Sequence, residues 1–427
     1  MRTPSVWLAA LALLGAAASR PALGQRPDSI RVRDSILANG LTAGEADAER
    51  PRRQLINQAN FDFGWTTMTI GGGLLVDYGA FDQDSLNREQ VHDVLGGKLR
   101  DARVLLGGKF KSKRPFTWQI GVMYDQLTNK WLFRQTGLMV AFPEAWGHLF
   151  IGRAKEGFSM NKVMVGYDGW SMERLPFTDA TVPLLADGIK WMGNTPDRHY
   201  FWNLGAFMDA LSEGQTFSSY NYQFVVRTGW VPMVADTAGT LLEMAMNFRA
   251  GDVNNDTLRL RSKPEAFTAP YYVNTDNFPA QSALAFGPEI FYRPGRVLVG
   301  AEYYWMKVNS RETGNPWFYG GEFSATWNTT GEVRSYNSVG NYFRTVSPTN
   351  TVIQGGPGAW ELVMKFTYTN LTNGPVQGGQ FWRFTPMINW YLTDNLRLEM
   401  AYGYGTLNKG GIVGRTAFSQ ARIQMRL

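Results

Sequence analysis

Residues 396–404 read LRLEMAYGY, a stretch in which large apolar side chains alternate with charged or small ones. Successive side chains of a β-strand point to opposite faces, so a period of two gives this segment one apolar and one polar face. The same pattern recurs in residues 360–368, 382–392 and 417–427. The apolar faces are rich in aromatic residues, and the polar faces carry full charges. This arrangement suits a strand with lipid on one side and water on the other.

Similar alternation runs through most of the remaining chain, in residues 67–78, 101–110, 116–125, 242–249, 284–293 and 296–305. A soluble β-sandwich can show the same period. Here Trp, Tyr and Phe gather on one parity of each segment, and the chain has no Cys that could form disulfides. We therefore predict an all-β fold, a transmembrane antiparallel β-barrel that spans residues 58–427.

The N-terminus carries the pattern of a secretory signal peptide. Arg2 precedes an apolar run over residues 6–18, and small residues flank Leu23 just before Gln25. We predict cleavage after Gly24, so that residues 1–24 are a signal peptide. Residues 25–57 are rich in charge and Ala, and we expect them to form a periplasmic N-terminal extension. Beyond residue 24 the sequence has no run of about 18 apolar residues, so no membrane-spanning helix is predicted.

Composition narrows the classes of partner. The chain has a formal net charge of +6 and 18% charged residues, against about 25% in soluble proteins. A balance this close to neutral does not predict nucleic-acid binding. We expect the partners to be outer-membrane lipid and small anionic or polar solutes.

The connections between the predicted strands differ in length. Residues 393–395 and 329–332 resemble short turns, whereas 81–98, 252–282 and 309–317 resemble longer loops. Residues 154–195 show little alternation and include Pro176 and Pro183. A patternless stretch of about forty residues is long for a simple connector. We expect it to fold into the lumen as a constriction loop.

Several motifs together resemble the phosphate-selective porin O and P family. They are Ile70-Gly71-Gly72, Asp77-Tyr78-Gly79 with Phe81, Gly107-Gly108, Phe150-Ile151-Gly152-Arg153 with Gly157-Phe158, Thr330-Gly331-Glu332 with Arg334 and Tyr336, Gly358-Ala359-Trp360-Glu361-Leu362, and Asn389-Trp390-Tyr391-Leu392. The resemblance covers about residues 61–427. It implies a homotrimer of barrels of about 16 strands each in the bacterial outer membrane, with an inward-folded loop in each pore.

The family's anion-binding residues are only partly present. The positions of its two adjacent arginines correspond here to Arg100 and Asp101, and Arg103 follows them. Its pore lysine corresponds to Lys162, and a later basic residue corresponds to Arg174. Three other positions depart from the pattern, because they are occupied by Gly73, Phe150 and Gln135. The resemblance therefore supports the architecture more strongly than it supports strict phosphate selectivity.

Positive and negative charges are nearly balanced on the polar parity of the strands, so many of them should form ion pairs across the wall. One basic cluster groups near the expected constriction. The predicted anion-binding residues are Arg100, Arg103, Arg134, Arg153, Lys155, Lys162 and Arg174. Fixed basic charges in a narrow lumen favour anions. We predict an outer-membrane porin, a passive channel for small anionic or polar solutes, with phosphate-type anions among them.

Two other classes of function are possible for a barrel. A barrel lipase or protease needs a nucleophile beside a base, but none of His92, His148 and His199 lies in such a motif. A structural or adhesive barrel would not conduct. No catalytic residue, cofactor or metal ligand is predicted, since Thr257 and Lys263 break the calcium-loop pattern that begins at Asp252. The chain ends on Leu427, where barrels of this kind usually end on an aromatic residue.

Overall fold

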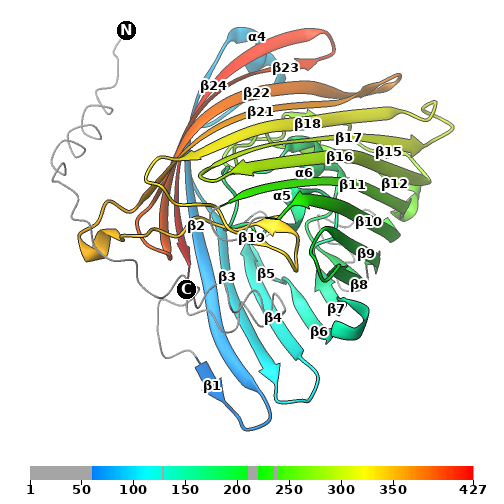
Figure 1. Ribbon diagram of the computed structural model, residues 1–427. Coiled ribbons are helices and arrows are strands. Elements are labelled where there is room, and N and C mark those ends of the chain that lie inside the picture. Colours follow the sequence, from blue (N-terminus) through cyan, green and yellow to red (C-terminus); the bar gives the residue numbers. More distant parts are fainter. Residues whose placement is uncertain (1–59, 127–128, 210–219, 235–238, 427) are drawn as a thin grey trace.

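The computed structural model describes residues 60–126, 129–209, 220–234 and 239–426, and in them the strands close into a 16-strand antiparallel β-barrel (Figure 1). The predicted signal peptide, the N-terminal extension and Leu427 lie outside the described residues. None of the helices among the described residues is both long and apolar enough to cross a membrane.

Neighbouring wall strands pair antiparallel in chain order, and β24 pairs with β2 to close the ring, with Arg422 opposite Asp77. The wall strands are β2 (Thr67–Gln83), β3 (Gly96–Phe110), β4 (Phe116–Asp125), β5 (Lys130–Phe133) continued by β6 (Thr136–Phe142), β7 (Gly147–Ala154), β8 (Ala186–Asn194), β9 (Tyr200–Met208), β10 (Tyr220–Met233), β11 (Thr240–Val253), β16 (Ser282–Pro294), β17 (Val297–Asn309), β18 (Trp317–Asn328), β21 (Ala359–Asn373), β22 (Val376–Tyr391), β23 (Leu396–Lys409) and β24 (Ile412–Arg426). The short strand β1 (Asn60–Asp62) pairs antiparallel with the first residues of β2 at one end of the barrel.

Burial separates the two faces of the wall as the alternation predicts. On β23, Tyr402 is 57% exposed on the outer face, whereas Glu399 is 1% exposed on the inner face. On β21, Met364 is 60% exposed and Lys365 is 1% exposed. The outer face is thus an apolar band that fits lipid, and the charged parity faces the lumen.

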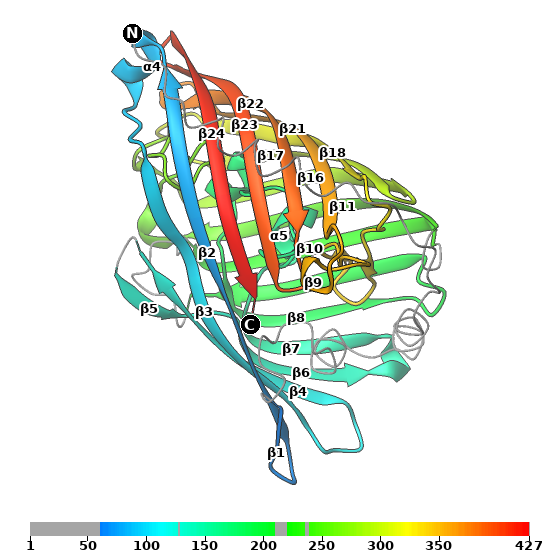
Figure 2. The same ribbon diagram turned by 90° about the vertical axis from the view of Figure 1, so that its left-hand side faces the viewer.

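The two ends of the barrel differ in their connections. At the end where β24 stops, most connections are short, such as the turn of η2 (Pro143–Ala145) between β6 and β7. The opposite end carries α4 (Ser85–Gln90) and the longer connections 155–185 and 254–281 (Figure 2). Short periplasmic turns and long outer loops are usual, so we assign the end with the C-terminus to the periplasm.

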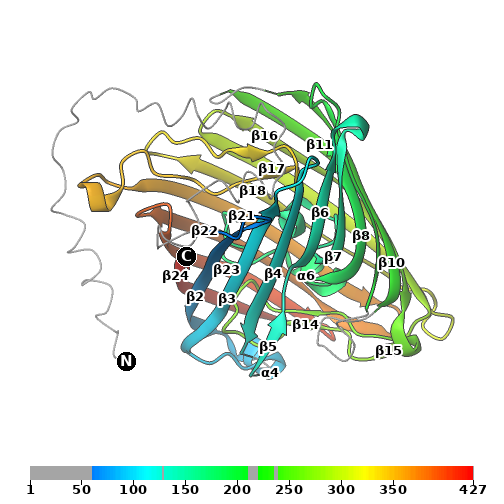
Figure 3. The same cartoon turned by 90° about the horizontal axis from the view of Figure 1, so that it is seen from below.

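Three connections fold into the lumen. The first inward segment, residues 155–185, contains α5 (Met160–Val163) and α6 (Pro176–Thr181). The second, residues 254–281, contains η3 (Asn254–Asp256), β12 (Thr257–Leu258), β13 (Arg261–Ser262), β14 (Val273–Asn274) and β15 (Phe278–Pro279). The third, residues 329–358, contains β19 (Tyr336–Asn337), β20 (Tyr342–Phe343) and η4 (Val352–Gln354). The third segment enters from the periplasmic end, at the side of the C-terminus (Figure 3).

Apolar packing fixes these segments against one side of the wall. Phe158, Leu175 and Phe177 of the first segment share a cluster with Leu260, Tyr272 and Phe278 of the second. Trp170 of the first packs beside Phe343 of the third in another cluster. Both clusters also include inward side chains of β17 to β24, such as Tyr304, Phe318, Phe381 and Phe418, so this half of the lumen is a packed core.

Two predictions about connections were wrong. Residues 329–332 are not a short turn but the start of the third inward segment, because β21 begins only at Ala359. The patternless stretch 154–195 is not one loop either, since β8 occupies Ala186–Asn194. The prediction of an inward loop is confirmed for residues 155–185. The inward segments 254–281 and 329–358 were not predicted.

Candidate constriction site

Carboxylates on three neighbouring wall strands hold the start of the first inward segment. Glu289 accepts the backbone N–H of Met160 at 2.8 Å, and Glu302 accepts the Ser159 hydroxyl at 3.0 Å. The Asn161 amide donates to both Glu302 and Glu322, at 2.8 and 2.6 Å. All of these carboxylates are buried, so their main role is to fix where α5 lies.

Cationic and amide side chains of β22, β23 and β24 hold the middle of the same segment. Arg397 donates to the Gly169 carbonyl at 2.7 Å, and Asn389 donates to the Trp170 carbonyl at 2.8 Å. Arg422 bonds the Met172 carbonyl and also pairs with Asp77 at 2.5 Å. The charges of β16 to β24 are therefore largely used to position the segment and to pair with each other.

The unfilled space lies on the other side, between the first inward segment and strands β2 to β9. Three cavities follow one another there. The outer cavity of about 230 Å³ is lined by the first and second segments, and the inner cavity of about 230 Å³ reaches Gly340 and Tyr342 of the third. Between them lies the constriction, about 50 Å³, which shares Arg100 and Arg174 with the outer cavity and Arg103 and Arg134 with the inner one. A cavity of 50 Å³ has room for only a few water molecules.

Five arginines and two carboxylates line this constriction: Arg100, Arg103, Arg134, Arg174, Arg422, Asp101 and Glu173. Three of the arginines have carboxylate partners, since Arg100 Nε lies 2.6 Å from Glu173, Arg103 pairs with Asp101, and Arg422 pairs with both Asp77 and Glu173. Arg103 also stacks on Tyr167, with its guanidinium carbon 4.2 Å from the ring centroid. The remaining positive charge is supplied by Arg134 and Arg174.

Arg134 lies beside a break in the wall and keeps the inward parity of β5. Trp131 and Phe133 of β5 are exposed on the outer face, whereas Arg134 is buried. β5 and β6 both pair with β4, and Arg134 and Gln135 lie in the break between them. The Arg134 backbone N–H donates to the Gly121 carbonyl at 2.7 Å, while its side chain reaches only within 3.9 Å of Asp101. The parity changes across the break, because Leu138 of β6 is exposed on the outer face.

Arg174 and Lys155 bond only to backbone carbonyls in the part of the chain that the structure describes. Arg174 Nε donates to the Asn161 carbonyl at 2.8 Å, and Lys155 donates to the Met164 carbonyl. A methyl group on Gly166 would lie 3.6 Å from an Arg174 nitrogen and 3.8 Å from an Arg103 nitrogen. The two guanidinium groups therefore approach the same point in the passage.

Burial perturbs the basic residues of the first inward segment, and nearby like charges add to its effect. Burial, together with nearby Arg174 and Arg134, lowers the pKa of Lys155 well below its usual value. Burial lowers the pKa of Lys162 to about 8, although Asp179 opposes the change, and burial together with Arg100 lowers the pKa of Arg174 to about 10. A bound anion would reduce this repulsion and raise these pKa values.

The structure brings together six of the seven predicted residues and separates the seventh. Lys162 lines the outer cavity, 3.5 Å from Asp179, and Lys155 lines the inner cavity. Arg153 is different, because its buried side chain pairs with Asp187 at 3.1 Å across β7 and β8. Arg153 does not line the three cavities and lies apart from the other six residues.

Sequence reasoning missed several basic residues along the passage. Lys190 of β8 lines the inner cavity, and Arg259, Arg261 and Lys263 of the second inward segment line the outer cavity. Lys190 lies between the outward-facing Ile189 and the large Trp191, which is an alternation signal within the stretch read as patternless. No comparable signal marks the second segment, because its short strands pair only with each other.

The residues considered for catalysis and metal binding lie apart. His92 belongs to the connection after α4, His148 to β7 and His199 to the turn before β9, where its Nδ1 lies 2.7 Å from the Val231 carbonyl. Among the described residues, no group of three or more His, Asp or Glu could hold a metal ion.

A protein-family comparison finds that the model of phosphate-selective porin O and P matches residues 68–427. A curated relative, an uncharacterized protein of Caulobacter vibrioides, is 28% identical over 131 residues. That alignment covers 31% of this chain and 26% of the relative, so the chain matches only about a quarter of that protein's length.

Solved outer-membrane proteins share the fold at low sequence identity. The anion-selective porin of Comamonas acidovorans aligns with 84% of this chain and 100% of its own, at 10% identity and a TM-score of 0.53. The outer-membrane channel DcaP of Acinetobacter baumannii aligns over 86% and 100%, at 8% identity and a TM-score of 0.53. The trimer form of OmpT of Vibrio cholerae aligns over 84% and 99%, at 10% identity and a TM-score of 0.52.

Proposed function

The chain belongs to the phosphate-selective porin O and P family of bacterial outer-membrane channels, and from this premise we propose that it passes small anions through an off-axis path. The path runs from the outer cavity through the constriction to the inner cavity, along the β2 to β9 side of the lumen. The observation that carries the proposal is the composition of the constriction, where five arginines face two carboxylates.

Anion preference follows from the size and charge of this constriction. A narrow passage with low-dielectric walls focuses the field of its fixed charges on a passing ion. The planar guanidinium of Arg suits carboxylate and phosphate oxygens, so Arg134 and Arg174 can replace part of an anion's hydration shell. Phosphate-type anions fit this chemistry, and so do other small anions, which is why the proposal does not include strict phosphate selectivity.

Basic residues on both sides extend the favourable field. The outer cavity carries Arg259, Arg261 and Lys263, and the inner cavity carries Lys155 and Lys190. Lys263 has the Phe267 ring 4.5 Å from its amino group, and it bonds the Phe267 carbonyl without a carboxylate partner among the described residues. An anion therefore meets positive charge before, within and after the constriction.

We further propose that the barrel assembles as a homotrimer in the outer membrane and has no enzymatic activity of its own. The trimer form of OmpT of Vibrio cholerae, which shares this fold, supports the assembly. The three histidines lie on separate segments, so they do not form a catalytic arrangement with one another.

Reversal potentials in a planar lipid bilayer test the proposed function. With purified protein and a KCl gradient across the membrane, we expect a reversal potential of the sign given by chloride flux, because the net charge of the constriction favours anions. Detergent-treated membrane without the protein is the control. A reversal potential that shows potassium preference in the intact protein would contradict the proposed function.

A further inference from the structure

The inner cavity has an apolar wall that a simple anion path does not need. Its side chains at lumen-facing positions include Leu105 on β3, Met139 on β6, Phe150 on β7 and Met192 on β8. The inward apolar side chains of β17 to β24, such as Tyr304, Phe318 and Phe418, are instead buried in the packed core. The apolar side chains of the wall that border open space therefore lie mainly in this part of the lumen.

This patch is separate from the packed half of the lumen. Phe150, Met192 and Ala154 form a small cluster of their own, with Met139 packed against it. Strand pairing places Met139 opposite Phe150, and Phe150 opposite Lys190. The result is a continuous row across three strands, with the Lys190 amino group 5.4 Å from the centre of the Phe150 ring.

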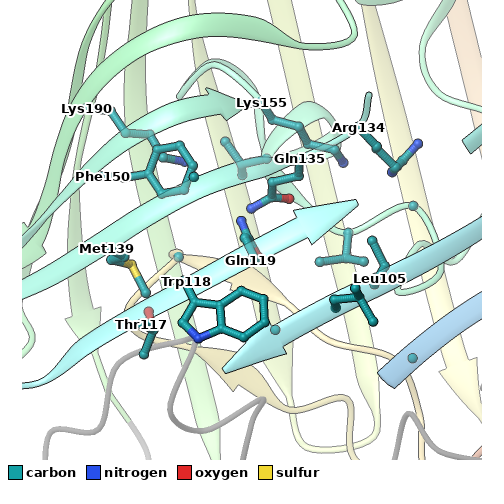
Figure 4. Close-up of a pocket in the computed structure, with 18 of the residues that line it drawn as sticks. Leu105, Thr117, Trp118, Gln119, Arg134, Gln135, Met139, Phe150, Lys155 and Lys190 are labelled. Carbon is teal, nitrogen blue, oxygen red and sulfur yellow. The ribbon is translucent and has the colours of Figure 1, made fainter. Parts of the chain in front are cut away.

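Cationic groups border the same cavity toward the constriction. Arg134 and Lys155 lie together on one side of the cavity, and Phe150 and Met139 lie on the other (Figure 4). Gln119 and Gln135 lie between the two sides in this view. Asn203 also lines the cavity, and its buried Oδ1 has no hydrogen-bond partner in the described part of the chain. The cavity thus offers an apolar surface, polar amides and a positive end.

We propose that the inner cavity accepts organic anions with a compact apolar body, namely small aromatic or branched aliphatic carboxylates. The carboxylate would lie at Arg134 and Lys155, and the apolar body would rest on Met139 and Phe150. The inference rests on the proposed function and names the class of solute that this anion path prefers.

The dimensions and energetics of the cavity suit such a solute. A dry cavity of about 150 Å³ holds a benzene ring, so the 230 Å³ inner cavity has room for benzoate with some water. Removing roughly 30 Å² of apolar surface from water favours the bound solute by about threefold. Acetate can bind the same cations but has almost no apolar surface to bury. The apolar wall should therefore make the channel prefer benzoate to acetate.

Bilayer recordings with potassium salts of benzoate and acetate test the inference. Under bi-ionic conditions we expect the native protein to pass benzoate about threefold more readily than acetate, against the order of their diffusion in water. We also expect millimolar benzoate to reduce the chloride current, because an anion that rests in the inner cavity occupies the path.

A matched pair of variants locates the effect. Met139→Gln keeps the length of the side chain and makes the wall polar, so the benzoate preference should be lost. Met233→Gln makes the same change at the exposed end of β10, outside the three cavities, and should keep the preference.

The outcomes separate this inference from the function on which it rests. Equal permeability of benzoate and acetate in native protein that remains chloride-selective would overturn the inference and leave the proposed function standing. An unchanged benzoate preference in Met139→Gln would overturn it too. Potassium selectivity in a KCl gradient would overturn both.

Discussion

Arg174→Glu is expected to remove most of the channel's preference for anions over cations. Arg174 lies where the outer cavity meets the constriction, half-buried, with backbone carbonyls as its hydrogen-bond partners in the described structure. The substitution changes the constriction from five arginines and two carboxylates to four arginines and three carboxylates. An acidic side chain beside Glu173 then attracts cations at the narrowest part of the path.

The expected size follows from Coulomb's law. Two unit charges about 8 Å apart interact by roughly 1 kcal/mol at an effective dielectric constant of about 40. A charge reversal changes the local charge by two units, and it acts in opposite directions on chloride and potassium. Since about 1.4 kcal/mol corresponds to a factor of ten, the chloride-to-potassium permeability ratio should fall by roughly tenfold or more. Reversal potentials in a KCl gradient measure this ratio.

Two further variants control for effects other than charge in the path. Arg88→Glu makes the same charge change on the exposed surface of α4, outside the lumen, and should leave the ratio within about twofold of native because salt screens exposed charge. Arg174→Gln keeps a hydrogen-bond donor for the Asn161 carbonyl and should give an intermediate ratio. If Arg174→Glu and Arg88→Glu have the same small effect, Arg174 does not lie on the path.

The second large effect is expected from Arg334→Ala, which should raise conductance and lower stability. Arg334 of the third inward segment pairs with Glu361 at 2.8 Å and donates to the Asp168 carbonyl of the first segment at 2.7 Å. Its side chain is fully buried. Removing it leaves Glu361 as an uncompensated buried charge, at a cost of roughly 3–5 kcal/mol in the free energy of unfolding.

The gain in conductance has a separate cause. Without Arg334 the third segment loses its hydrogen bond to the first, and Tyr342 can withdraw from the inner cavity. We expect larger single-channel currents with more frequent transitions between levels. The thermal unfolding temperature in detergent and single-channel recordings measure the two effects. The control is Arg296→Ala, an exposed arginine in the turn between β16 and β17 at the same end of the barrel.

A double variant separates stability from conductance. Arg334→Ala with Glu361→Ala removes the orphaned charge as well as its partner, so part of the stability should return while the conductance stays high. If Arg334→Ala alters neither conductance nor unfolding, the third inward segment does not depend on this ion pair.

The barrel was predictable because lipid and lumen impose opposite demands on alternate residues. Tyr402 and Glu399 illustrate this, since their parity alone placed one outside and the other inside. The family resemblance and the strand count are confirmed by the family match and by the closed ring. Long barrel strands leave a regular pattern because each spans the membrane and meets the same two environments along its length.

The filling of the lumen was only partly predictable. Thr329, Thr330 and Gly331 do end β18 in a turn, and Gly331 has a positive φ of 106°, but nothing local shows that the chain then enters the barrel. The inward segments contain little regular secondary structure and are held by side chains that are distant in sequence. For example, Arg383 of β22 donates to the Pro264 carbonyl of the second segment. Contacts of this kind depend on the closed ring and leave no periodic signal.

The same limit applies to the site. Lys162 and Arg174 could be placed near the constriction from the family motif, and the structure brings both to the passage. Arg153 lies apart from the other predicted residues because it pairs with Asp187 on β8, a strand that went unrecognised. Gly188 and the charged Asp187 weaken the alternation of β8 in the sequence. The glycine is required by the structure, because a Cβ at residue 188 would lie 2.1 Å from the Ala206 carbonyl oxygen on the paired strand β9.

Cysteine modification measures most directly whether ions cross by the off-axis path. The chain has no Cys, so a single introduced thiol is unambiguous. Ser171 lines the constriction, whereas Ser324 is buried on β18 in the packed half of the lumen. Anionic 2-sulfonatoethyl methanethiosulfonate should reduce the current of Ser171→Cys by more than half and leave Ser324→Cys and native protein unchanged. Full current through modified Ser171→Cys, or equal block in Ser324→Cys, would contradict the off-axis path.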